Sequence, residues 1–248
     1  MGKHSKKEKK SNLLLVLLQI IFVAIFIYSG YHIINWYKEN KENNEILDQM
    51  SKAVKIEKDE EGNESYKVDF EQLKQTNEDI VGWIKVNNTK VEYPVVQGKD
   101  NSYYLTHSIE KKYNAGGSIF VDSQNKLDGT DRNVVIYGHN RRDGSMFGTL
   151  KNALNKEWYD NEENKYITIV APDGEIQYEI FSIYQIEKED YYIKKNFTDA
   201  EFKQFVDTIK SRSVKDFNAD VDENSKVLTL STCANDNKYR VVIHAKEI

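Results

Sequence analysis

The chain has 248 residues, a formal net charge of −5, five histidines and a single cysteine. One cysteine excludes a disulfide framework within the chain, and no group of Cys and His residues has the spacing of a zinc site. The first 12 residues carry a local charge of +4, so the remainder carries −9, which argues against a nucleic-acid-binding protein with its usual basic face.

A lysine-rich tail, residues 1–12, leads directly into an apolar segment, residues 13–34. As a helix this segment would be about 33 Å long and could span a bilayer. Lysines on the short leading side favour a cytoplasmic N-terminus. A cleavable signal peptide is the alternative, but its apolar core should be shorter, and Tyr28-Ser29-Gly30 is a poor cleavage site. We therefore expect an uncleaved transmembrane signal anchor, single-pass in the cell membrane, with the rest of the chain extracellular.

The segment after the anchor, residues 35–65, is highly charged and is expected to connect it to a folded domain, residues 66–248. Four apolar residues of the connector have helical spacing: Ile46, Leu47, Met50 and Val54. The connector is therefore either a helix packed on the domain or a solvated stalk. The domain has enough Val, Ile, Tyr and Phe to bury an ordinary core.

The domain opens with a helical pattern over residues 69–80, and the residue pattern then changes to one typical of strands. Eight short runs rich in β-branched and aromatic residues follow, at residues 81–86, 91–98, 116–122, 133–140, 165–170, 176–186, 226–233 and 239–248. Two helical patterns interrupt them, over residues 146–154 and 198–213, and Pro172-Asp173-Gly174 predicts a hairpin turn. Eight short strands with few helices favour a mainly β fold, a closed or nearly closed β-barrel.

The single cysteine, Cys233, ends the seventh of these strands, and Arg240 lies at the start of the eighth. If the two strands pair as a hairpin, these residues are opposed, with Cβ atoms about 4.5–5.5 Å apart. An ordinary cysteine has a pKa near 8.5, so a fixed cation beside it would raise the reactive thiolate fraction. Arginine can also donate hydrogen bonds to a developing oxyanion. The alternative to this nucleophile is a small buried hydrophobe.

A cysteine nucleophile needs a proton partner, which is usually histidine. Two of the five histidines lie in the tail or at the membrane edge, and His244 lies roughly 13 Å from Arg240 along the last strand. His139 ends the fourth strand before a turn-prone segment, where a side chain can face a cleft, whereas His107 has no such flanking strand end. Position therefore favours His139 and leaves His107 as the alternative.

The stretch "TLSTC" at residues 229–233, followed by Arg240 in the next strand, with "YGHN" upstream and a membrane anchor at the N-terminus, resembles the sortases, cysteine transpeptidases of Gram-positive cell surfaces. The resemblance covers essentially the whole domain. The helical segment before the first strand and the late helix make the chain most similar to class B. The resemblance implies an eight-stranded sortase-type β-barrel, with N-terminal helices and one late inserted helix, and a catalytic set of His139, Cys233 and Arg240.

The resemblance also implies the reaction. Such an enzyme cleaves the C-terminal sorting signal of a secreted protein after threonine, forms a thioacyl intermediate on Cys233 and transfers the protein to an amine of a peptidoglycan precursor. His139 would protonate the leaving amine and Arg240 would stabilise the oxyanion. No cofactor or metal is implied, and the acidic run at residues 216–223 lacks the spacing of an EF-hand loop and is expected to be a solvated face. The alternatives are a membrane-tethered cysteine endopeptidase that releases its product by hydrolysis and a non-catalytic surface module.

Five further residues are implied to line the sorting-signal groove: Asn101, Leu105, Tyr192, Ile193 and Ser231. The alternative is that they are structural, with leucine and isoleucine in the core and the asparagine capping a turn. The loop at residues 234–239 is short for a class B enzyme, and Ala234 follows the cysteine where some relatives have a polar residue. This departure leaves the sorting motif open.

Overall fold

The computed structural model describes residues 4–58, 64–127, 130–233 and 238–248, and the chain divides into two compact units, Met1–Ile46 and Leu47–Ile248. Helix α1 (His4–Ser51) makes up the described part of the first unit and continues into the second. Its large apolar side chains between Leu13 and Tyr37 are exposed. Among the described residues, α1 is the helix that is long enough and apolar enough to cross a membrane.

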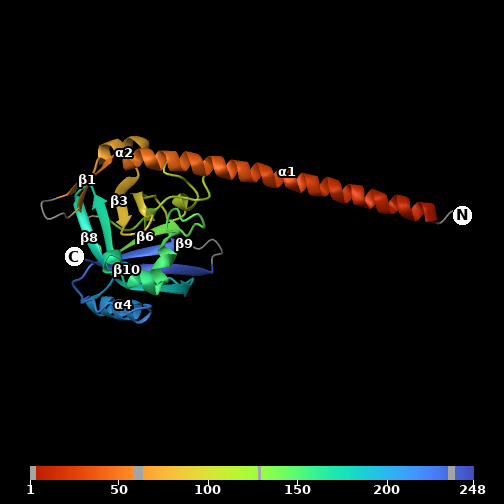
Figure 1. Cartoon of the computed structure of the whole chain (residues 1–248). Coiled ribbons are helices and arrows are strands. Elements are labelled where there is room, and N and C mark those ends of the chain that lie inside the picture. Colours follow the sequence, from red (N-terminus) through yellow and green to blue (C-terminus); the bar gives the residue numbers. More distant parts are fainter. Residues whose placement is uncertain (1–3, 59–63, 128–129, 234–237) are drawn as a thin grey trace. The chain divides into compact units, whose positions relative to one another are not determined.

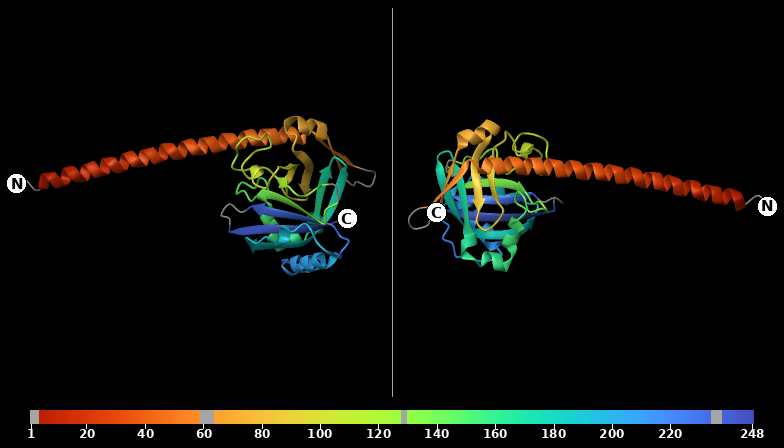
Figure 2. Two further views of the ribbon diagram at one scale, coloured as in Figure 1. Left: turned by 180° about the vertical axis from the view of Figure 1, so that it is seen from behind. Right: turned by 45° about the horizontal axis from the view of Figure 1, so that its top comes forward.

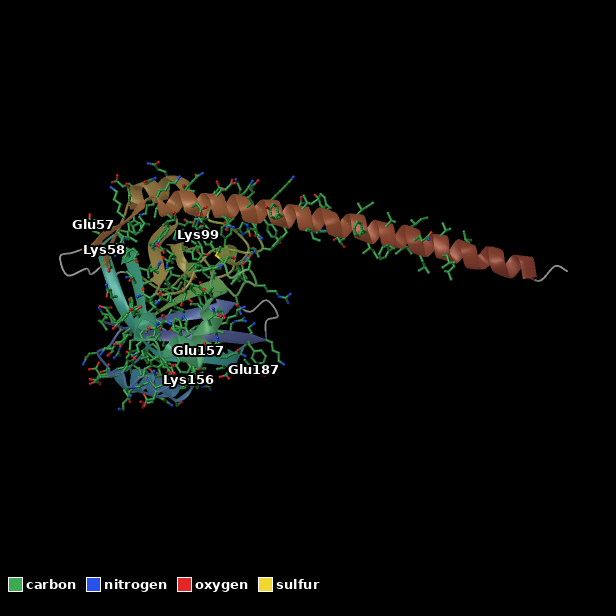
Figure 3. The ribbon with its side chains drawn as sticks, in the orientation of Figure 1. Glu57, Lys58, Lys99, Lys156, Glu157 and Glu187 are labelled. Atoms are coloured by element: carbon green, nitrogen blue, oxygen red, sulfur yellow. The ribbon has the colours of Figure 1, made fainter. Side chains whose placement is uncertain are left out.

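The connector is helical only in its first half. Leu47 and Met50 lie in α1 and pack against the core of the second unit. The helical prediction is wrong for Val54, because α1 ends at Ser51 and a two-stranded antiparallel sheet follows, β1 (Val54–Lys58) and β2 (Glu64–Val68). The sequence of β1, VKIEK, alternates apolar and charged residues, which is the period of a strand. Figure 3 labels Glu57 and Lys58 at the end of β1.

Eight further strands form the predicted closed barrel: β3 (Ile80–Val86), β4 (Glu92–Val96), β5 (Phe120–Val121), β6 (Asn133–His139), β7 (Tyr166–Ala171), β8 (Gly174–Glu187), β9 (Val227–Cys233) and β10 (Tyr239–Glu247). Their order round the barrel is β10-β8-β7-β3-β4-β5-β6-β9. Figure 1 labels β3, β6, β8, β9 and β10 of this barrel. The pairs β4–β5 and β6–β9 are parallel and the other pairs are antiparallel. Each predicted strand is present, and the mainly β barrel is confirmed.

The predicted hairpin turn lies between β7 and β8. Ala171 pairs with Gly174, so Pro172 and Asp173 are the two turn residues. Gly174 has a φ of 142°, in a region that side chains with a Cβ rarely adopt. The proline and the glycine therefore end one strand and begin the next.

Short helices connect the strands: α2 (Phe70–Thr76), η1 (Tyr103–Leu105), η2 (Leu150–Leu154), α3 (Lys156–Tyr159), η3 (Glu162–Lys165), η4 (Tyr191–Ile193) and α4 (Asp199–Ser211). The helix predicted over residues 146–154 is only the 3-10 turn η2, because Met146 has a φ of 52° and two glycines lie near the start of that run. The helix predicted over residues 69–80 ends at Thr76, since Asn77 is extended and Ile80 begins β3.

Helix α4 covers one side of the barrel. Thr198 and Glu201 form a capping box at its N-terminus, and its apolar face packs on β8, β9 and β10. Figure 2 shows α2 and α4 on opposite sides of the barrel. The main core fills the barrel interior, where residues such as Ile84, Ile136 and Leu230 are fully buried. Both faces of β9 and β10 are therefore covered over most of their length.

Candidate active site

Three adjacent strands bring the predicted catalytic residues to one place. Strands β6 and β9 are parallel, and their register places His139 beside Cys233. Strands β9 and β10 are antiparallel, and their register ends with Val242 opposite Ser231, two residues from Arg240 and from Cys233. Glu187, labelled in Figure 3, is the β8 partner of Tyr239 and so marks this end of β10. The backbone of the only cysteine thus lies between the strand ends that carry the candidate histidine and arginine.

Thr232, which the sequence reasoning did not single out, fixes the start of β10. Its side chain is fully buried, and its hydroxyl accepts a hydrogen bond of 2.8 Å from the backbone N–H of Val241. A buried N–H needs such a partner, since leaving it unpaired costs about 1–3 kcal/mol. The threonine next to Cys233 therefore holds the residue next to Arg240 against β9.

His139 is oriented by a backbone carbonyl. Its Nε2 lies 2.7 Å from the carbonyl oxygen of Leu105 at the end of η1, so Nε2 carries a proton and donates it to that oxygen. Burial lowers the pKa of His139 most strongly; the Leu105 carbonyl opposes this, and the positive charges of Arg141 and Arg240 lower it further. We therefore expect the Arg240 guanidinium to favour the neutral form of this imidazole.

Gly138, in the "YGHN" stretch, is required by a close contact beside His139. A Cβ at this position would lie 2.7 Å from Cγ of Phe147, whose side chain is fully buried. Real Cβ atoms essentially never approach this closely. The phenylalanine ring therefore packs directly on the strand backbone next to the candidate histidine.

Gly138→Ala is expected to lower the free energy of unfolding by about 1–3 kcal/mol, because the added methyl group overpacks the site against Phe147. Thermal and denaturant unfolding of the purified full chain would measure the loss. The double variant Gly138→Ala/Phe147→Leu should lose less free energy of unfolding than the sum of the two single variants, since leucine leaves room for the added methyl group. Equal stability of Gly138→Ala and the parent chain would contradict the close contact.

The two other histidines of the folded unit have structural partners. The ring of His107 stacks on Tyr103 with centroids 4.0 Å apart, and its Nδ1 lies 2.8 Å from the Tyr103 carbonyl oxygen. His244 is fully buried, with its two ring nitrogens against Tyr184 and Thr229. Of the three, the strand register places His139 beside Cys233.

Asn101 is the most exposed of the predicted groove residues that the structure describes, but its amide is occupied. Its Nδ2 donates to Asp122 at 2.8 Å, and its Oδ1 accepts from the backbone N–H of Ser123 at 2.8 Å. Leu105 is half-buried and contacts His139 through its carbonyl oxygen. Leu105 at the end of η1 therefore touches the candidate histidine, whereas Asn101 is bonded to Asp122 and Ser123.

The other predicted groove residues lie on η4 and β9. The side chains of Tyr192 and Ser231 are buried, and their hydroxyl oxygens are 3.1 Å apart. Ile193 is half-buried and packs on the cluster beneath α4. The structure thus brings Tyr192 and Ser231 into direct contact.

Asp122, which the sequence reasoning missed, links Asn101 to Tyr137 on β6 and to Lys195, which follows η4 in the chain. Its carboxylate, 1% exposed, accepts from Asn101, from the Tyr137 hydroxyl at 3.0 Å and from the Lys195 ammonium at 3.0 Å. Burial alone would raise the pKa of this carboxyl, but the Gln124 N–H, Lys195 and Tyr137 together lower it. The only sequence signal was an aspartate directly after an apolar strand.

The loop at residues 234–237, predicted to bear on substrate choice, lies outside the described residues.

Comparisons with known proteins agree with this geometry. A sortase-domain family model matches residues 84–248. Sortase B of Staphylococcus aureus is 34% identical over 238 residues, which cover 94% of this chain and 96% of that protein; sortase B of Listeria monocytogenes is 35% identical, with 92% and 94% covered. Sortase B of B. anthracis, in a crystal structure of its complex with AAEK1, superposes with a TM-score of 0.74 at 31% identity over 86% of this chain and 99% of that one. A structure titled Staphylococcus aureus sortase B-substrate complex gives a TM-score of 0.68 at 37% identity over 72% and 84%. With its closed barrel, its cysteine at the end of β9 and these relatives, the chain belongs to the sortase family of cysteine transpeptidases, in the class B group.

Proposed function

We propose that this transpeptidase cleaves a C-terminal sorting signal after threonine, holds the cleaved protein as a thioester on Cys233, and transfers it to an amine of a peptidoglycan precursor. The observation that carries the proposal is the register of β6 and β9, which pairs His139 with Cys233, and Arg240 lies two residues before the first β9–β10 pair, that of Val242 with Ser231. Family membership supplies the reaction class, and this alignment supplies the residues for it.

In the first proposed step, the Cys233 sulfur attacks the threonine carbonyl carbon and the carbonyl oxygen becomes an oxyanion. Arg240 stabilises that oxyanion with its charge and its N–H donors. Because burial and two arginines favour neutral His139, the imidazole can take the thiol proton as the sulfur attacks. The resulting imidazolium then protonates the leaving amine, the peptide bond breaks and the thioester remains.

In the second step, the acceptor amine attacks the thioester carbon, neutral His139 removes the amine proton, and the Cys233 thiolate leaves as the new amide forms. We assign the transferred proton to Nδ1 of His139, since the Leu105 carbonyl occupies Nε2–H. That hydrogen bond also fixes the ring orientation and stabilises the imidazolium, as a buried acceptor does behind other catalytic histidines.

The same proposal places the enzyme at the cell surface. The apolar stretch of α1 supports a single-pass membrane anchor, and the five lysines before it support a cytoplasmic N-terminus with an extracellular catalytic domain. The domain division follows, with a tail at residues 1–12, an anchor at 13–34, a connector at 35–65 and the catalytic domain at 66–248. The partners are secreted proteins with a C-terminal sorting signal and the amine acceptor.

Asn101, Leu105, Tyr192, Ile193 and Ser231 are proposed to form the sorting-signal groove. The contacts of Leu105 with His139, and of Tyr192 with Ser231 in the strand of Cys233, support this assignment. Buried Tyr192 and Ser231 would shape the wall, whereas Asn101, Leu105 and Ile193 retain exposed surface for a peptide.

The test is a reaction of the full chain in detergent micelles with a library of threonine-containing peptides, with and without a primary amine such as oligoglycine. We expect a peptide–amine product whose yield rises with amine concentration. Release of the cleaved acid alone, unaffected by the amine, would instead identify a cysteine endopeptidase. Absence of any cleavage, with the thiol inert to alkylation in the folded chain, would favour a non-catalytic surface module.

A further inference from the structure

A chain of buried hydrogen bonds begins at His244 and runs to the helical turn η4. Nε2 of His244 lies 2.8 Å from the Tyr184 hydroxyl, and the Tyr191 hydroxyl donates to that same hydroxyl at 2.8 Å. Tyr184 is 2% exposed and His244 is fully buried, with its ring centroid 6.2 Å from that of Phe181 and 6.0 Å from that of Phe205. One end of this chain is therefore the first residue of η4.

The chain continues on the other side of the imidazole and returns to the same segment. Nδ1 of His244 lies 2.9 Å from the Thr229 hydroxyl, which donates to Oδ1 of Asn133 at 2.7 Å. The amide nitrogen of Asn133 donates to the carbonyl oxygens of Tyr192 at 3.1 Å and Lys194 at 2.8 Å. The segment Tyr191–Lys194 is thus held at both ends by one imidazole.

Only one assignment of donors and acceptors satisfies all the hydrogen bonds from Tyr191 to Asn133. Tyr184 accepts from Tyr191, so its own proton points to Nε2 of His244, and the ring proton must then be on Nδ1. That proton goes to Thr229, whose hydroxyl proton goes to Asn133. A neutral Nδ1–H imidazole satisfies every bond in the chain, and burial lowers the pKa of His244 to about 3, which keeps the ring neutral. We call these four residues, Tyr184, His244, Thr229 and Asn133, the core relay.

The relay connects this segment to the three strands of the active site. Asn133 lies on β6, Thr229 on β9 and His244 on β10, the strands that carry the three catalytic candidates. Thr229 and His244 are directly opposed in the β9–β10 register. The relay therefore bonds the segment directly to Tyr184 on β8 and Asn133 on β6, and through them to Thr229 on β9 and His244 on β10.

We propose that His244 is a positioning residue, which holds the Tyr191–Lys194 segment against β6, β9 and β10 through the core relay and thereby sets the affinity for the sorting signal. The inference rests on the proposed role of Tyr192 and Ile193 as a groove wall. It assigns no contact between His244 and the substrate, and no part in the thiol chemistry. Loss of one relay bond should therefore loosen the groove wall and leave Cys233 as reactive as before.

The experiment uses the full chain, with Tyr184→Phe and Thr229→Val cutting the relay on either side of the imidazole. We expect each variant to raise the KM for the peptide that the parent chain uses by about three- to tenfold, the worth of one buried hydrogen bond, with kcat and the alkylation rate of Cys233 within twofold of the parent. The matched control is Tyr178→Phe, a buried tyrosine on the same strand and outside the relay, for which KM should not change.

The double variant Tyr184→Phe/Thr229→Val tests whether the two substitutions raise KM through the same imidazole or independently. If both bonds act through one imidazole, KM in the double variant should be close to that of the worse single variant, whereas independent effects would multiply. Unchanged KM in both single variants, or a fall in kcat without a rise in KM, would overturn the proposal while the parent chain still transfers its peptide. If the proposed function is wrong, the parent chain itself will not transfer a peptide. The relay can still be tested without substrate, because nitrogen-detected NMR of the parent chain should show His244 as the neutral Nδ1–H tautomer.

Discussion

Cys233→Ala is expected to abolish both cleavage of the sorting peptide and its transfer to an amine, with a loss of at least about a thousandfold in kcat, because the proposed acyl intermediate forms on this thiol. Product formation should be followed by liquid chromatography at saturating peptide and amine. The fold should persist, since β9 is held by seven register pairs to β6 that do not need the thiol.

The control for this variant is chemical. The chain has one cysteine, so alkylation of the parent protein must modify Cys233 and should produce the same loss. A saturating sorting peptide should slow the alkylation, because the thioester occupies the sulfur. Retention of more than a tenth of the parent kcat by Cys233→Ala would remove the thiol from the mechanism.

Arg240→Lys is expected to lower kcat by about 100-fold, although the charge is kept, because an ammonium does not reproduce the planar donors that would bind the oxyanion. Arg240→Gln should lose about 100- to 1000-fold, since both the charge and that donor geometry are gone. Thermal unfolding should be close to that of the parent for both variants, as the side chain is half-exposed. Unchanged turnover in Arg240→Lys would remove this residue from the mechanism.

The two arginine variants should differ in their effect on His139. Arg240 lowers the pKa of His139, so Arg240→Gln should raise that pKa and Arg240→Lys should leave it low. NMR titration of the imidazole would measure both. Arg142→Gln is the matched control, since it removes one exposed positive charge close to His139 in sequence that does not contribute to the shift. The same pKa in Arg240→Gln and the parent would contradict the electrostatic contact across the strand ends.

Local pattern was sufficient to predict the barrel strands. Runs of β-branched and aromatic residues, separated by turns such as Pro172-Asp173, predict β3 to β10. The hairpin of β9 and β10 could be predicted for the same reason, because only a short loop separates them. The sheet of β1 and β2 was missed, since strongly charged side chains made residues 54–68 resemble a solvated connector.

Local patterns could not predict how distant parts of the chain pair, although position and resemblance favoured His139 as the partner of Cys233. His139 and Cys233 are 94 positions apart and meet through a parallel pairing of β6 with β9, which no local signal specifies. Asp122 gains its role only when Asn101, Tyr137 and Lys195 converge on it. His244 could be set aside as a catalytic candidate from its distance to Arg240, but its partners Tyr184 and Thr229 become apparent only in the folded barrel.

The most direct test of the central claim is intact-mass analysis of the full chain mixed with a cleavable sorting peptide in the absence of any amine. The account predicts a mass increase equal to the peptide fragment up to its threonine, located on Cys233 by tandem mass spectrometry and discharged when an amine is added. Cleavage and transfer without any adduct on Cys233, or an adduct on another residue that survives Cys233→Ala, would contradict it.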